Sequence, residues 1–290
     1  MGANMDDRDW KILDVLYEQK NITKSAEVLF ISQPALTKRV MQIEEHFGVK
    51  IVDRGIRGVQ FTPQGEYLAH RAAEVLTLYR EIKEDVSNMN DEIVGTLRIG
   101  VSNFFGKYKF PELIQRFTSQ YPKVSFQVET GLSKDIFNLT YNHHVHVGFV
   151  RGDYSWPDQK YLLFNENIVI ASKSKIEIED LPNLPRIDFE TDHLFKALVD
   201  NWWNQHFSKS PNILMKVDRG DTCREMVTRD IGYAIMPNMF LQDVPDIHQI
   251  PIKSQDGMTL TRPTWMFYHE SSLVQNVVTA FVQFIKENPI

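Results

Sequence analysis

Side chains able to hydrogen-bond to DNA bases lie close together near the N-terminus. Gln33 and Thr37 are one helical turn apart and Lys38 follows directly, so a helix would present all three away from its apolar side. An α-helix fits the major groove of DNA, where amide, hydroxyl and ammonium groups reach base edges. Pro34 and Ala35 can contact a thymine methyl group. We therefore expect these five residues to read base sequence.

Hydroxyl and basic side chains that suit DNA phosphates lie on either side of these residues. Thr23, Lys24 and Ser32 precede them and are expected to contact the DNA backbone. Arg54 and Arg57 follow them and are expected to bind the backbone beside an adjacent minor groove. A charged helical face can instead be merely solvated, and this alternative is open for each residue taken alone.

The spacing of apolar residues predicts the elements that carry these side chains. An amphipathic helix is predicted to start near Asp9, and a short second helix covers Thr23–Phe30. Ser32 is a good N-cap and Pro34 fits the first turn of a third helix, which Gly48 ends. The pattern therefore predicts a helix-turn-helix whose later helix carries the base-reading residues.

A small β-hairpin is predicted to follow this helix-turn-helix. Two short apolar runs, Ile51–Val52 and Val59–Phe61, are separated by glycines, as is typical of a hairpin wing. The wing and residues 20–39 carry local positive charge, although the chain has 32 Lys and Arg against 38 Asp and Glu, a formal net charge of −6. We expect residues 1–62 to form a winged helix-turn-helix DNA-binding domain.

The next segment, residues 63–94, is predicted to be one long linker helix. Its apolar residues alternate in steps of four and three, a 3.5-residue repeat typical of a coiled-coil seam. They are Leu68, Ala72, Val75, Tyr79, Ile82, Val86 and Met89. We expect this helix to pair with the same helix of a second subunit; the alternative is a core helix packed within one chain.

Residues 95–290 alternate strand-like and helix-like segments, which predicts a mostly parallel sheet with covering helices. Two sets of such segments indicate two α/β lobes. Lobe I covers about 95–166 and 266–290, and lobe II covers about 167–265. Two lobes imply a cleft between them, which is a common binding site for a small ligand.

Composition limits the class of protein. A chain of 290 residues with 42% apolar residues can bury sizeable cores in about two domains. A single cysteine, Cys223, excludes an intramolecular disulfide framework and a thiolate-rich zinc site. No apolar run approaches the roughly 18 residues of a membrane span, and the first residues are too acidic for a secretory signal. We expect a cytoplasmic protein without membrane contact.

Several stretches resemble a known family. Thr23–Gly48 and Phe61–Gly65 resemble the DNA-binding domain of LysR-type transcriptional regulators, and Gly95–Ser102, Phe117–Pro122 and Gly232–Pro237 match landmarks of their effector domain. The resemblance implies an α/β fold with an N-terminal winged helix-turn-helix, a long dimerising linker helix and a two-lobed, periplasmic-binding-protein-like effector domain. It also implies double-stranded promoter DNA and a small-molecule effector as ligands, a homotetramer, and RNA polymerase as a further partner.

The resemblance also places the effector between the two lobes. Carried onto this chain, the family's effector-contacting positions are Ser102, Asn103, Phe104, Thr130, Gly131, Arg151, Asp192, His193, Asp221 and Thr222. No other cofactor and no metal is expected.

The chemistry of these positions favours an anionic effector. Free N–H groups at a strand-to-helix junction such as Ser102–Asn103 favour an anion, so a small carboxylate is the expected ligand. Arg151 would be its charge partner, with an ion pair to Asp153 at the surface as the open alternative. Asp192 and Asp221 oppose a polyanion unless a basic side chain turns into the cleft. The candidates for that side chain are Lys107, Lys196 and Arg219.

Two further features invite a sensing role. His143, His144 and His146 can supply metal ligands, but alternation along a strand sends His143 to the opposite side and no thiol is near. Cys223 lies near the cleft and could be a redox sensor, yet without a second cysteine a packed residue is favoured.

Two other classes of protein compete with a regulator. An enzyme is disfavoured because the chain has no phosphate-binding glycine loop, no Gly-x-Ser-x-Gly elbow and no His-Glu-x-x-His helix. A cytoplasmic small-ligand-binding protein would use the same two-lobed cleft, but it would not need the fused helix-turn-helix.

Overall fold

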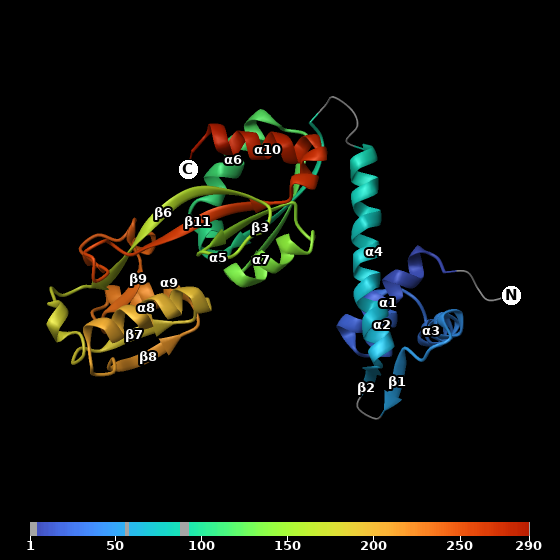
Figure 1. The fold of residues 1–290 in the computed structure, drawn as a ribbon, viewed down its shortest axis with the longest axis horizontal. Coiled ribbons are helices and arrows are strands. Elements are labelled where there is room, and N and C mark those ends of the chain that lie inside the picture. Colours follow the sequence, from blue (N-terminus) through green and yellow to red (C-terminus); the bar gives the residue numbers. More distant parts are fainter. Residues whose placement is uncertain (1–4, 56–57, 88–92, 290) are drawn as a thin grey trace. The chain divides into compact units, whose positions relative to one another are not determined.

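The computed structural model describes residues 5–55, 58–87 and 93–289. The chain divides into two compact units, residues 1–87 and residues 88–290 (Figure 1). No helix in these described ranges is long and apolar enough to cross a membrane.

The N-terminal unit is a helical domain with a two-stranded wing. Its elements are α1 (Asp7–Gln19), α2 (Ile22–Val28), α3 (Gln33–Phe47), β1 (Val52–Gly55), β2 (Gly58–Phe61) and α4 (Pro63–Ser87). Side-chain oxygens of Asp6, Asn21 and Ser32 cap the first three helices. Gly48 ends α3 in the left-handed conformation at φ 66°, which glycine adopts without strain.

A buried ion pair joins the first and third helices of this unit. Arg39 on α3 donates from Nε to Asp9 Oδ1 at 2.5 Å and from Nη2 to Asp9 Oδ2 at 2.7 Å. The Asp9 side chain is only 1% exposed, so water cannot solvate its carboxylate, and the Arg39 guanidinium supplies the hydrogen bonds and the opposite charge instead. The hydrogen bond to Asp9 raises the pKa of Arg39, which keeps the guanidinium charged. The pair fixes α3 against α1.

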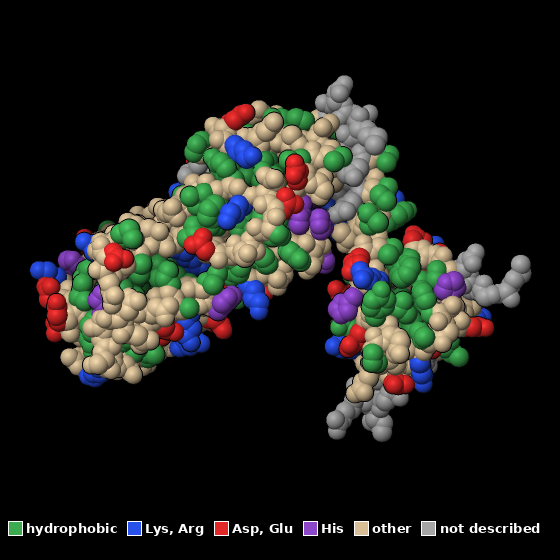
Figure 2. Space-filling model, in the orientation of Figure 1, with side chains coloured by type: hydrophobic (Ala, Val, Ile, Leu, Met, Phe, Trp, Pro, Cys, Tyr) green, Lys and Arg blue, Asp and Glu red, His purple; other side chains and the backbone are tan. Residues whose placement is uncertain are grey.

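Helix α4 changes character along its length. Leu68 and Ala72, near its start, are buried in the core that α4 shares with α1. Tyr79, Ile82 and Val86, farther along, are each about half exposed or more in the single chain. Figure 2 shows apolar side chains along this part of the helix. The apolar residues of the 3.5-residue repeat therefore lie in the core at the start of α4 and form an exposed apolar surface farther along it. The last predicted member of the repeat, Met89, lies outside the described residues.

The C-terminal unit has two lobes built on strands that run through both. Its strands are β3 (Gly95–Ser102), β4 (Val124–Gly131), β5 (Val147–Arg151), β6 (Gln159–Ser172), β7 (Arg186–Phe189), β8 (Ile213–Val217), β9 (Ala234–Pro237), β10 (His248–Pro251) and β11 (Thr261–Tyr268). Its α-helices are α5 (Asn103–Tyr108), α6 (Phe110–Gln120), α7 (Ser133–Tyr141), α8 (His193–His206), α9 (Gly220–Thr228) and α10 (Asn276–Glu287).

The prediction of a mostly parallel sheet is wrong. The larger sheet has the order β10-β6-β11-β5-β3-β4, with β9 also paired to β6, and only β3 pairs in parallel, with β4 and β5. The long strand β6 leaves lobe I for lobe II and β11 returns beside it, so these two strands pair antiparallel. A two-strand connection between lobes therefore makes the sheet mixed.

Each lobe has its own core. In lobe I, α6 and α10 pack on one face of the sheet, where Phe117 and Phe281 meet edge to face at 4.9 Å (Figure 1). Helix α7 covers the other face through Ile136. In lobe II, Trp202 and Trp203 of α8 are buried against the end of β6. Separate cores leave the boundary between the lobes free to form a cleft.

Candidate functional site

The turn between α2 and α3 presents a continuous exposed surface. Residues 30–35 are all exposed, and Lys38 is exposed one turn farther along α3. This surface includes four of the predicted DNA-contacting residues: Ser32, Gln33, Pro34 and Ala35. The Ser32 hydroxyl accepts a hydrogen bond from the Ala35 N–H at 3.4 Å, so it caps α3 while remaining exposed. Thr23 and Lys24 are also exposed, in the first turn of α2.

Three other predicted DNA contacts have different surroundings. Thr37 is half-buried, and its hydroxyl is buried with no hydrogen-bond partner among the described residues. Arg54 lies on β1 opposite Val59 of β2, which places it on the wing. Arg57 lies outside the described residues.

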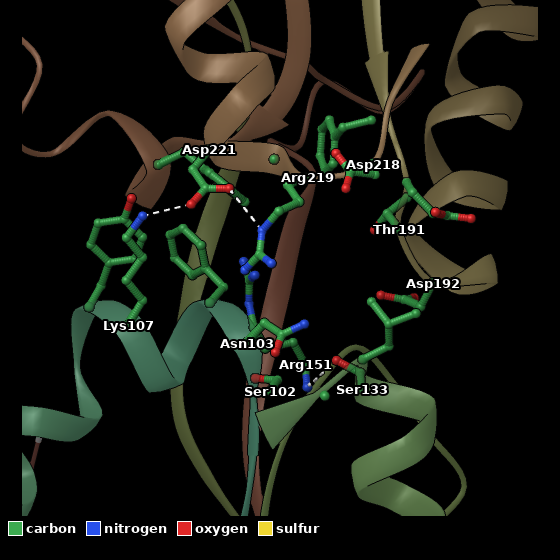
Figure 3. A pocket seen from close by; sticks show the side chains of 18 of the residues that line it. Ser102, Asn103, Lys107, Ser133, Arg151, Thr191, Asp192, Asp218, Arg219 and Asp221 are labelled. Carbon is green, nitrogen blue, oxygen red and sulfur yellow. Dashed lines mark hydrogen bonds and ion pairs between the residues drawn. The ribbon is translucent and has the colours of Figure 1, made fainter. Parts of the chain in front are cut away.

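A cavity of about 350 Å³ lies between the two lobes of the C-terminal unit (Figure 3). Seven of the ten predicted effector positions line it: Ser102, Asn103, Phe104, Gly131, Arg151, Asp192 and Asp221. Thr130, His193 and Thr222 do not. Each of these three is a neighbour of a lining residue in sequence.

The lining also contains residues outside the ten predicted effector positions. Two of them, Lys107 and Arg219, were predicted as basic side chains that could turn into the cleft; the third such candidate, Lys196, does not line the cavity. The others are Tyr108, Leu132, Ser133, Phe189, Glu190, Thr191, Asp218, Gly220, Phe240 and Arg262. Tyr108 lies one helical turn after Phe104 on α5, so helical spacing could have found it. Arg262 could not be found this way, because it reaches the cavity only through the antiparallel return of β11.

Arg151 is paired inside the protein. Its Nε donates to Glu166 Oε1 at 2.9 Å, and both side chains are almost completely buried. Its guanidinium lies 4.4 Å from the centroid of the Phe104 ring. The alternative of a surface ion pair with Asp153 is therefore wrong, because Arg151 points inward along β5 and Glu166 on β6 faces it.

A second buried pair forms the adjoining wall. Arg262 binds Asp192, whose other oxygen accepts from the Phe195 N–H at 3.0 Å and caps α8. Burial, and then the nearby charge of Arg151, lower the pKa of Arg262 to about 10. Among the described residues, neither Arg262 Nε nor Ser102 Oγ has a hydrogen-bond partner, although both atoms are buried. The wall thus carries two unsatisfied polar groups beside the cavity.

Helix α5 of lobe I holds lobe II through three side chains. Lys107 donates to Asp221 at 2.7 Å, and Arg224 donates to the Tyr108 hydroxyl at 3.0 Å. The Phe104 ring lies 4.0 Å from Phe240 within the core of lobe II. The hydrogen bond between Lys107 and Asp221 raises the pKa of the ammonium and lowers that of the carboxyl. Figure 3 shows this ion pair at the edge of the cavity, with Arg219 on the other side of Asp221.

The candidate sensing residues have other partners. The His143 ring stacks on His269 at 3.8 Å, whereas His146 is buried and accepts from the Arg98 N–H at 3.2 Å. No group of three or more metal-ligating side chains occurs in the part of the chain that the structure describes. Cys223 is fully buried, its thiol donates toward Ile187 O at 3.6 Å, and burial raises its pKa to about 12.

Both units match known protein families. Residues 8–66 match the bacterial regulatory helix-turn-helix protein, lysR family, and residues 90–289 match the LysR substrate binding domain. The HTH-type transcriptional regulator YraN of Bacillus subtilis, itself uncharacterized, is 39% identical over 282 residues, which cover 97% of this chain and 98% of that protein. The B. subtilis regulator YkuM is 33% identical, over 95% of each chain.

Solved structures show the same fold over the whole length. The crystal structure of CbnR, a LysR family transcriptional regulator, covers 99% of this chain and all of that chain with a TM-score of 0.70 at 17% identity. Full-length CbnR complexed with target DNA matches with a TM-score of 0.69 at 18% identity. With a helix-turn-helix at one end, a two-lobed cleft at the other and both family models matched, this chain belongs to the LysR-type transcriptional regulators and is not an enzyme.

Proposed function

We propose that this regulator binds promoter DNA through the exposed start of α3 and that a small carboxylate in the interlobe cavity modulates this binding. The surface from Ser32 to Lys38 supplies hydroxyl, amide and ammonium groups on a helix, which suits the major groove. Thr23, Lys24 and the wing residues Arg54 and Arg57 supply contacts to the phosphate backbone.

The class of ligand is inferred from one observation: two buried polar groups beside the cavity have no hydrogen-bond partner among the described residues. Ser102 is 2% exposed and Arg262 6% exposed, and an unpaired polar atom at such a site costs free energy. Both Ser102 Oγ and Arg262 Nε can donate, and a carboxylate is acceptor-only. Ser133 adds a third donor, a hydroxyl that accepts from the Arg151 N–H at 3.2 Å and keeps its own proton for a ligand. A carboxylate bound between them would satisfy all three donors.

Helix α5 supplies a route from the cavity to the arrangement of the lobes. Asn103 and Phe104 at its start line the cavity, and Lys107 and Tyr108 at its end hold lobe II. A ligand carboxylate near Lys107 competes with Asp221 for the ammonium group. The ligand then favours one arrangement of the lobes over another, as any effector must to change DNA binding.

The exposed apolar residues of α4 support the proposal that the protein forms a dimer. Val75, Tyr79, Ile82 and Val86 present apolar area that a second α4 would bury, which gives a dimer and a two-fold site on DNA. We place a homotetramer of this kind in the cytoplasm on promoter DNA, with RNA polymerase as its further partner.

The test uses the full chain and a DNA duplex that it selects from a randomised library. Binding and footprint are measured with benzoate, succinate or citrate, and with benzamide and succinamide as uncharged matched controls. We expect at least one carboxylate, and neither amide, to alter the footprint, and Ser102→Ala to weaken that response. Selection of a duplex with no response to any carboxylate would reject the ligand class and leave DNA binding in place.

A further inference from the structure

Phe30 is the most exposed large apolar side chain among those that the structure describes, at 95%. It lies in the turn between α2 and α3, two residues before the Ser32 cap. Its backbone has φ +55°, in the left-handed region that glycine and asparagine tolerate and bulky residues avoid. The turn therefore carries a residue that is unfavourable there in both conformation and exposure.

The turn holds the backbone of Phe30 in place. The Phe30 N–H donates to Glu27 O at 3.1 Å, and the next N–H, of Ile31, donates to Ala26 O at 3.0 Å. Ala26 is buried in the core of the unit, so this backbone is anchored on the inner side. At 95% exposure the ring packs on almost nothing in its own chain. Neither local conformation nor folding stability thus accounts for a phenylalanine at this position.

The surroundings of Phe30 are those of the DNA-facing surface. It is the first of six consecutive exposed residues that run through Gln33 to Ala35 at the start of α3. Helices α2 and α3 also expose Thr23, Lys24 and Lys38, whose groups suit phosphates and bases. Val28 and Ile31, near Phe30 in sequence, expose apolar area as well, but about half as large a fraction of it. An aromatic ring next to such groups can pack on the apolar face of a sugar or on a base.

We propose that Phe30 is a DNA-contacting residue whose ring packs against a deoxyribose of the strand beside the start of α3. This contact buries the ring, adds affinity that does not depend on charge, and fixes the depth at which α3 enters the groove. The proposal rests on the proposed placement of α3 in the major groove and needs no effector in the cavity.

The experiment compares Phe30→Asn with the wild-type chain on a duplex that the wild type selects from a randomised library. Asparagine tolerates the left-handed turn, so we expect the thermal unfolding midpoint to stay or rise. We expect affinity to fall about tenfold, both for the selected duplex and for random DNA, with the slope of log K against log salt unchanged because no charge is removed. Met258→Asn removes an exposed apolar side chain from the other unit and is the matched control. We expect it to change neither the thermal unfolding midpoint nor the affinity for DNA.

Lys38→Ala separates failure of this proposal from failure of α3 as the reading helix. If Lys38→Ala flattens the salt slope while Phe30→Asn binds as the wild type does, the Phe30 contact is refuted and the helix assignment stands. A sedimentation change in Phe30→Asn with unchanged DNA affinity would likewise refute it, by assigning the ring to contact between protein chains. Replacing thymidine by deoxyuridine in the duplex tests the sugar contact. If this replacement lowers the affinity of the wild type but not that of Phe30→Asn, the ring contacts a thymine methyl group and not a deoxyribose.

Discussion

The DNA-facing surface and the interlobe cavity are assembled in opposite ways. The exposed residues at the start of α3 are consecutive in sequence, and few of them bind another side chain of the chain. The cavity takes its lining from stretches spread between Ser102 and Arg262, and most of its charged groups are already paired. Arg151 with Glu166, Arg262 with Asp192 and Lys107 with Asp221 are three such pairs.

This difference sets how each region responds to change. Apart from Ser32, which caps α3, a residue on the DNA-facing surface acts alone, so its substitution removes one contact and leaves its neighbours in place. A charged residue of the cavity wall such as Arg151, Asp192 or Arg262 has a partner, so its substitution leaves a second group unpaired in a buried place. Independent effects are expected on α3 and coupled effects around the cavity.

The largest effect is expected from the pair of Arg39 with the buried Asp9 in the N-terminal unit. Arg39→Ala leaves the Asp9 carboxylate buried without its partner, which should lower the free energy of unfolding of this unit by about 3 kcal/mol. Hydrogen exchange of the α1 and α3 amides across a urea series measures it, because tryptophan fluorescence would mix signals from both units. Arg71→Ala is the control, because its partner Glu74 is exposed and such pairs contribute less than about 1 kcal/mol. Equal stability of the two variants would show that the Asp9 pair is no more than a surface contact.

The same contrast explains what the sequence could predict. The helix-turn-helix, its Ser32 cap and the Gly48 stop depend on local patterns, and they occur where the spacing placed them. In the cavity, Asn103 and Asp221 are next to recognisable strand and helix boundaries. Glu166 and Arg262 are not, because they face the cavity wall only through the crossing of β6 and β11, and no local spacing encodes that crossing.

A smaller effect is expected at Lys38. Lys38→Ala removes one exposed ammonium that binds no other described side chain, so protein stability should not change. Affinity for DNA should fall about tenfold at low salt, and the salt slope should lose about one unit per DNA-contacting subunit. Fluorescence anisotropy across a salt series measures both. A slope equal to that of the wild type would mean that Lys38 is not in contact with phosphate.

At the cavity, Ser102→Ala removes a buried hydroxyl with no partner among the described residues. We expect unliganded stability to stay or rise slightly, since an unsatisfied buried group is removed. Affinity for an effective carboxylate should fall about fivefold, the effect of one hydrogen bond. Calorimetry measures the affinity, and Ser174→Ala, whose hydroxyl bonds Asp230 away from the cavity, is the matched control. Equal ligand affinity in both variants would exclude Ser102 from the ligand site.

The smallest effect is expected at Cys223, where we predict none. Its thiol is fully buried in the core of lobe II, and burial raises its pKa to about 12, so the reactive thiolate is scarce throughout the neutral range. The native protein should react with iodoacetamide at pH 8 only as fast as it unfolds, and Cys223→Ala should keep its response to any effector. Dilute peroxide should change DNA binding of neither protein. Rapid labelling of the native thiol would show that lobe II opens more readily than its packed core implies, and the cavity wall would then share that motion.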